Sequence, residues 1–172
     1  MDHQCRLRQG TIADVDALTI LVRQLGYPAQ TGPVRLTLEK LLAHPEHAVV
    51  VAEERGVVEG FLTLSSRPSL SLQGTVGCVD ELVVHVGAQG RGIGGRLLQY
   101  AKGLATERGF VRLEIGVPDV LDMVASGFAV ARGFEVCDEA TYRWSPLESK
   151  HPPLPVSLGA SRSMRIAGGG GR

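Results

Sequence analysis

The spacing of apolar side chains in the first third of the chain predicts one short strand followed by two helices. Apolar and charged residues alternate over 5–8, as they do in a strand. Thr11 and Asp14 have the spacing of a capping box, and apolar residues then recur at helical spacing until Gly26. A second helix is expected to have Pro33 in its first turn, where the missing N–H of proline costs nothing.

Apolar runs predict strands in the middle of the chain. Residues 47–53 and 57–64 flank a turn and should form an antiparallel hairpin. Residues 65–75 are largely polar and contain a proline and a glycine, so a loop is expected there. A long apolar strand is expected over 76–86, although an Asp-Glu pair interrupts it.

A glycine-rich loop joins this strand to a helix that should continue to about Arg108. The remaining elements expected from the pattern are a strand, a helix interrupted by a glycine, and a strand pair, over 111–117, 119–132, 134–137 and 141–144. Hairpins thus precede the glycine loop, and one strand-loop-helix-strand unit contains it. This order predicts an α/β fold with a mixed, mostly antiparallel sheet flanked by helices.

Composition narrows the class of protein. The 172 residues fit one domain, placed at 1–147, and the proline- and glycine-rich stretch 148–172 is expected to be a disordered tail. Basic and acidic residues balance at 18 each, which argues against a nucleic-acid partner or an anionic membrane. With no apolar leader and no apolar span of about 18 residues, a cytoplasmic protein is expected. The three cysteines lack metal-binding spacing, so we expect reduced thiols and no metal.

The glycine loop matches two different phosphate-binding patterns. Gly90–Gly95 satisfies G-x-G-x-x-G, and Glu114 follows at about the distance of the acidic residue that binds ribose in dinucleotide-binding domains. However, hairpins precede this loop, whereas a dinucleotide-binding domain is built from two βαβαβ halves. A small NAD-dependent oxidoreductase is therefore the third-ranked hypothesis.

The second pattern agrees with the surrounding sequence as well. Gln89–Gly94 fits Q/R-x-x-G-x-G/A, within the stretch ELVVHVGAQGRGIGGRLLQYA (81–101). Together with FAVARGF (128–134), this stretch resembles the GNAT superfamily of acyl-CoA-dependent N-acyltransferases, and the resemblance covers about residues 6–147. It implies the acyl-CoA N-acyltransferase fold and an N-acetyltransferase that uses acetyl-CoA, and it leaves a homodimer as a possible assembly.

The chemistry of coenzyme A explains the use of such a turn. Its pyrophosphate can accept hydrogen bonds from successive backbone N–H groups at a helix N-terminus, and glycines permit close approach and positive φ. By resemblance, the pantetheine arm should pair with Leu82, Val83 and Val84. The pyrophosphate should be bound by the loop and by two arginine side chains, in a set comprising Gln89, Gly90, Arg91, Gly92, Ile93, Gly94, Gly95 and Arg96.

Two carboxylates are candidates for the catalytic base. Acyl transfer to an amine needs a proton acceptor, and Glu81 lies in an apolar strand beside the expected thioester, with Asp80 expected on the other face. A carboxylate bonded to a neighbouring element explains Glu81 equally well. Glu114 is the second candidate, by resemblance to relatives in which the acid of this strand serves as the base. The alternative interpretation of Glu114 is a structural salt bridge to Arg96 or Arg112. His85 has the place of a strand-end residue that is usually structural.

The family's usual general acid is missing from this chain. The tyrosine of its F-Y-x-x-x-G-F signature falls at Ala129, which keeps open a catalytically weak acyl-CoA-binding or sensing domain. No cysteine is placed as a nucleophile, so the acceptor amine should attack the thioester directly. The acceptor, a primary amine of a small molecule or peptide, should be bound by the first two helices and the loops 26–33 and 65–74, where the sequence has no acidic cluster.

Overall fold

A computed structural model of the chain describes residues 5–116 and 127–135. Its helices and strands are β1 (Arg6–Gln9), η1 (Ile12–Asp14), α1 (Val15–Gln24), α2 (Thr31–Ala43), β2 (His47–Glu54), β3 (Val57–Ser69), β4 (Gly74–Val84), η2 (Val86–Ala88), α3 (Ile93–Glu107) and β5 (Arg112–Ile115). Two of these, η1 and η2, are short 3-10 turns. Within the described ranges, no helix is both long and apolar enough to cross a bilayer.

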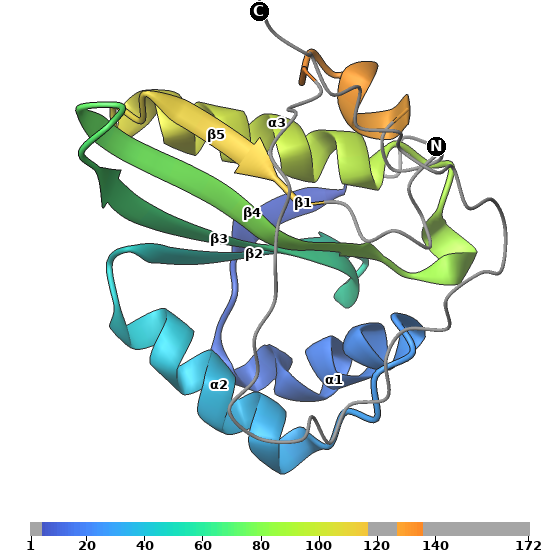
Figure 1. Cartoon of the computed structure of the whole chain (residues 1–172). Coiled ribbons are helices and arrows are strands. Elements are labelled where there is room, and N and C mark those ends of the chain that lie inside the picture. Colours follow the sequence, from blue (N-terminus) through green and yellow to red (C-terminus); the bar gives the residue numbers. More distant parts are fainter. Residues whose placement is uncertain (1–4, 117–126, 136–172) are drawn as a thin grey trace, which may run out of the picture.

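Five strands form one sheet in the order β1-β2-β3-β4-β5, so each strand lies beside its neighbour in the sequence (Figure 1). The first three pairings are antiparallel, and β5 joins β4 in parallel after the crossover helix α3. The prediction of a mixed, mostly antiparallel sheet flanked by helices is confirmed. The described strands do not form the two repeated parallel halves that a dinucleotide-binding domain needs.

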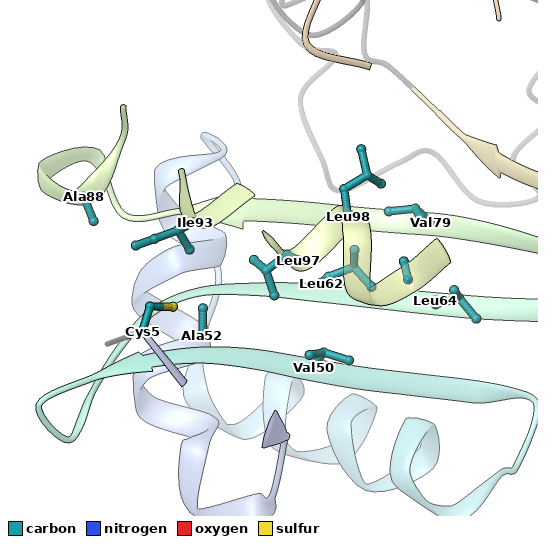
Figure 2. Packing of buried hydrophobic residues seen from close by; sticks show 11 residues of the cluster. Cys5, Val50, Ala52, Leu62, Leu64, Val79, Ala88, Ile93, Leu97 and Leu98 are labelled. Carbon is teal, nitrogen blue, oxygen red and sulfur yellow. The ribbon is translucent and has the colours of Figure 1, made fainter. Parts of the chain in front are cut away.

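Helices cover both faces of the sheet. α1 and α2 pack on one face, and α3 lies on the other (Figure 1). The alternation of side chains along β2 supplies both cores, because Val49 and Val51 point toward α1 and α2, whereas Val50 and Ala52 point toward α3. Figure 2 shows the core under α3, where Val50 and Ala52 share a cluster with Leu97. The sheet is therefore the middle layer of three.

The predicted polar loop over 65–75 is wrong in extent. β3 continues to Ser69 and β4 begins at Gly74, so only residues 70–73 form the turn, in which Gln73 has φ 52°. The ladder continues through Arg67, which is opposite a residue of β4. Side chains of this extension are exposed or half-buried, so backbone pairing forms it without any hydrophobic signal in the sequence.

The predicted helix ends agree with the structure to within a few residues. Gly26 follows the end of α1 with φ 85°, and Gly109 follows the end of α3 with φ 66°. Both are left-handed positions that favour glycine after a helix. Pro33 lies in the first turn of α2, as expected.

Some predictions fall wholly or partly outside the described residues. Of the helix expected over 119–132, residues 127–130 are helical, and 119–126 lie outside the described ranges. Phe134 and Glu135, at the start of the expected strand pair, are described and are not in a strand. The rest of that pair and the tail 148–172 also lie outside the described ranges.

Arg8 connects β1 to η1 and to β2. Its Nη1 and Nη2 donate to both carboxylate oxygens of Asp14 at 2.9 and 2.8 Å, and its Nε donates to Glu53 at 2.8 Å. Asp14 also accepts a hydrogen bond from the Thr11 N–H at 2.8 Å, which confirms the predicted capping box. The side chain of Asp14 is only 6% exposed, and the Arg8 guanidinium holds the pKa of this carboxyl below its usual range.

Asp14→Asn should lower the free energy of unfolding by about 2–3 kcal/mol, because it weakens a bidentate contact and leaves Arg8 partly unpaired. Since the folded-state pKa of Asp14 is lowered, the wild-type contribution is present above the ordinary Asp pKa of about 3.9. It is lost as the pH falls through the lowered value. Urea unfolding of both proteins at pH 7 and at about pH 2 measures this, and their difference should shrink in acid.

Glu53→Gln is the matched control for Asp14→Asn. Glu53 bonds to the same arginine but is 24% exposed, so its loss should cost no more than about 1 kcal/mol. Equal destabilisation by the two variants would show that Asp14 stabilises the fold no more than Glu53 does.

Candidate functional site

One edge of β4 is open beyond the point where β5 ends. β5 pairs with β4 only through residues 76–79 of β4. Over 80–84, no described residue is paired with that edge, although β3 continues along the other edge. Figure 1 shows β4 running on past the arrowhead of β5 toward the turn that precedes α3. The backbone of this segment is therefore available on one side.

The backbone groups of this open edge alternate in direction. The His85 N–H donates to a carbonyl of β3 at 2.7 Å, and the Val83 carbonyl lies 2.8 Å from the position a Cβ would take at Gly60. Residues 83 and 85 thus face β3, so the N–H groups of Leu82 and Val84 point to the open edge. Of the three residues expected to pair with pantetheine, these two offer their backbone groups there, whereas Val83 is turned toward β3.

The predicted phosphate turn lies between β4 and α3. Gly90 and Gly92 adopt φ of 77° and 82°, where any other residue is strained, and neither has an atom within 4 Å of its Cβ position. α3 begins at Ile93, and the N–H groups of its first turn have no intrahelical acceptor. Two positive-φ glycines and a helix N-terminus together make an arrangement in which backbone amides bind anions.

Three side chains fix the backbone that leads into this turn. Gln24 of α1 accepts a hydrogen bond from the Val86 N–H at 2.9 Å, and His85 Nδ1 accepts one from an N–H of η2 at 3.2 Å. Gln89 Nε2 reaches back to the Val84 carbonyl at 3.4 Å. His85 therefore caps η2, and the glutamine at the head of the motif contributes its side chain to the shape of the turn.

Gly94 and Gly95 serve a different purpose from the two positive-φ glycines. A Cβ at Gly94 would lie 3.2 Å from the ring of Phe128, and one at Gly95 would lie 3.0 Å from Nε of Arg132. The segment 127–135 can therefore pack directly on the first turn of α3. The sequence motif alone predicts phosphate binding for all these glycines, because a packing partner so far along the chain leaves no local signal.

Arg91, in the turn before α3, and Arg96, in its first turn, both lie toward the β1 and β2 side of the sheet. Arg91 is ion-paired with Glu54 at the end of β2. Burial raises the pKa of Cys5 at the start of β1, and the nearby charges of Arg96 and Arg91 oppose this. Arg91 also borders an open cavity of about 430 Å³, lined by Glu54, Arg55, Val57, Glu59 and Arg91.

A β-bulge in β4 places Asp80 and Glu81 on the same face of the sheet. Thr63 is opposite Glu81 while the next residue of β3 is opposite Val79, so Asp80 is the extra residue. Thr63 Oγ1 donates to Glu81 at 2.8 Å, and Ser65 Oγ bonds to Asp80 at 3.0 Å. Because residues 63 and 65 share one face of β3, the expectation that Asp80 points to the opposite face is wrong. Both carboxylates are exposed.

Glu114 lies on this same face and is held by arginines. It is opposite Cys78, and it pairs with Arg67 at 3.3 Å and with Arg112 at 2.6 Å. Burial, followed by the charge of Asp80, raises the pKa of Cys78 to about 11, so this thiol is protonated near neutral pH and is unsuited to nucleophilic attack.

Three carboxylates thus gather on the face of the sheet that carries α1 and α2, and we call Asp80, Glu81 and Glu114 the acidic face. The bulge and the β4-β5 pairing bring Glu114 together with two carboxylates that are distant from it in sequence. The expectation of no acidic cluster around the acceptor, made for the first two helices and the loops 26–33 and 65–74, stays a prediction. No group of three or more His, Cys, Asp or Glu within the described ranges is arranged to hold a metal ion.

Position 129 carries no hydroxyl. Ala129 is 5% exposed, and its carbonyl accepts hydrogen bonds from the N–H groups of Arg132 and Phe134 at 2.9 and 3.2 Å. The residue therefore helps to fold the turn that lies against α3 and offers no proton donor of its own.

Comparison with known proteins identifies the family of this chain. The profile of the acetyltransferase (GNAT) family matches residues 15–134. The chain belongs to the GNAT acetyltransferase family. A search of curated protein sequences finds no match.

This chain aligns with solved structures of the same fold, and the alignments cover nearly the whole length of those structures. A transcriptional regulator from Bacillus halodurans C-125 aligns with a TM-score of 0.75 and 18% identity, over 83% of this chain and 100% of that one. Aminoglycoside N-acetyltransferase AAC(6')-Iy in complex with CoA gives 0.72 and 19%, over 84% and 96%. An aminoglycoside acetyltransferase from an uncultured soil metagenomic sample, in complex with sisomicin, gives 0.70 and 21%, over 84% and 97%.

Gly92→Ala should lower the free energy of unfolding by about 1–2 kcal/mol, because alanine is strained at φ 82° even though the space is open. Gly103→Ala is the matched variant inside α3, at an exposed site with nothing near the Cβ position. It should raise the stability by about 0.5–1 kcal/mol. Chemical denaturation measures both, and a stabilising Gly92→Ala would refute the left-handed geometry of the turn.

Proposed function

We propose that the protein is an acetyl-CoA-dependent N-acetyltransferase that moves an acetyl group to a primary amine of a small molecule or peptide. One observation carries the proposal: the open edge of β4 leads directly into the positive-φ turn at the N-terminus of α3. The two amides of a pantetheine arm can pair with Leu82 and Val84 as an added strand would. The pyrophosphate then reaches the backbone N–H groups of Gly92–Gly95.

The transfer is a direct displacement. The acceptor nitrogen attacks the thioester carbonyl carbon, and the oxyanion that forms accepts a hydrogen bond from a backbone N–H of the open edge. The C–N bond forms, the C–S bond breaks, and the sulfur leaves as a thiolate that takes its proton from water. The amine loses one proton to a base, directly or through a water molecule. No covalent acyl-enzyme is needed, in agreement with the protonated thiol of Cys78.

Glu81 is the better of the two candidate bases. Its side chain is exposed on the acidic face, and the Thr63 hydroxyl orients one of its oxygens. Glu114, in contrast, has guanidinium groups against both oxygens, from Arg67 and Arg112, and would have to leave them to take a proton from substrate. We therefore assign Glu114 to holding the edge strand and to the charge of the acidic face.

The acidic face also favours a cationic acceptor. Asp80 and Glu81 raise the local concentration of protonated amines, and Asp80 can bind a second amino group while Glu81 faces the reacting one. The buried Ala129 supports one alternative, a coenzyme A-binding domain of low catalytic activity. Turnover separates the two functions.

Coenzyme A and acetyl-CoA should raise the melting temperature of the protein, whereas NAD should not. Gly92→Glu should abolish the shift, because it introduces strain and a negative charge where the pyrophosphate would lie. Gly103→Glu adds the same charge to the exposed middle of α3 and should keep the shift. Stabilisation by NAD alone would overturn the proposal.

Glu81→Gln should lower kcat/KM for amine acetylation by about 10²–10⁴-fold, as expected for loss of a general base. The readout is transfer of labelled acetyl from acetyl-CoA to a panel of amines. Asp80→Asn, one residue away on the same face, should raise KM for cationic acceptors with less effect on kcat. An unchanged kcat/KM in Glu81→Gln would show that another group is the base.

A further inference from the structure

α3 has two flanks, and only one of them faces the open edge of β4. The strand order puts β1 and β2 on one side of the sheet and the open edge on the side of β5. Arg91 is paired with Glu54 of β2, and the charge of Arg96 acts on Cys5, the residue just before β1. The side chains expected from the sequence to bind the pyrophosphate therefore lie on the flank away from the path proposed for pantetheine.

The other flank carries a different arginine. The ring of Phe128 lies 3.2 Å from the Cβ position of Gly94, and Cγ2 of Val84 lies 3.6 Å from the same point, so Phe128 is beside the end of the open edge. Next to it, Nε and Nη2 of Arg132 lie 3.0 and 3.1 Å from the Cβ position of Gly95. The guanidinium is thus placed against the first turn of α3.

Arg132 is held in this position by several contacts. Its guanidinium stacks 3.7 Å from the centre of the Phe128 ring, and its Nη1 donates to the Phe128 carbonyl at 2.9 Å. Lys102 of α3 donates to the Arg132 carbonyl and lies 5.1 Å from the centre of the Phe134 ring. A stacked, planar guanidinium loses little freedom when it binds an oxyanion, which suits it to bidentate phosphate recognition.

We infer that Arg132 binds a phosphate group of bound coenzyme A, in the role expected from the sequence for the Arg91 and Arg96 side chains. The inference rests on the proposed function, and it assigns a residue that lies outside the glycine motif. The backbone amides of the turn and the Arg132 guanidinium place positive charge on the same flank of α3, and a phosphate there neutralises both. Gly95 is then needed because a side chain would push the guanidinium away from the helix.

The test measures the affinity of the full-length protein for coenzyme A and for 3′-dephospho-coenzyme A by calorimetry. Arg132→Gln should weaken coenzyme A binding by about 10- to 100-fold, the range for loss of a charge-assisted hydrogen bond. Arg132→Lys should recover part of this, because it keeps the charge but not the stacked fork. Arg108→Gln removes the same charge at the far end of α3 and serves as the control for net charge.

Each outcome separates the inference from the proposed function. If Arg132→Gln weakens both ligands equally, the contact is to the pyrophosphate; if only coenzyme A is weakened, it is to the 3′-phosphate, and either result supports the inference. A larger loss in Arg91→Gln or Arg96→Gln than in Arg132→Gln overturns it, as does an unchanged Arg132→Gln. Failure of the wild-type protein to bind coenzyme A at all would instead refute the proposed function. Thermal unfolding without ligand identifies any variant that is misfolded.

Discussion

The site depends on the point along β4 at which its pairing with β5 ends. Parallel pairing covers residues 76–79, while β3 follows β4 to its end. A strand held firmly on one edge is rigid enough to present its other edge in a fixed geometry. The open edge, the positive-φ turn and the first turn of α3 then follow one another along the chain without a break. The sheet in this way determines where a ligand can lie before any catalytic side chain is considered.

Glycines in the connecting loop solve two separate problems. Gly90 and Gly92 allow left-handed backbone and leave their surroundings open. Gly94 and Gly95 remove side chains from one flank of α3, so that Phe128 and Arg132 can approach. The four glycines look alike in the sequence, but two of them allow a left-handed backbone and the other two make room for packing. This division also explains why the segment 127–135 can share a site with residues so far before it in the chain.

Much of the fold could be predicted from the sequence, because apolar periodicity records which face of each element is buried. The order of the elements along the chain follows from it, while glycines mark the helix ends at Gly26 and Gly109 and the turn before α3. The extension of β3 past residue 65 could not be predicted, since exposed backbone pairing leaves no hydrophobic pattern. The bulge at Asp80 was missed for the same reason, and with it the acidic face. Arg132 was missed because its importance comes from a contact between distant segments.

The bulge at Asp80 has a further consequence for how this protein behaves in concentrated solution. An unpaired strand edge is a template on which another chain can add a strand, and such contacts lead to aggregation. Here the edge opens at a bulge that carries two adjacent carboxylates, which disturb a regular ladder and repel a second copy of the same segment. The feature that arranges the acidic face thus also discourages strand addition from a neighbouring molecule.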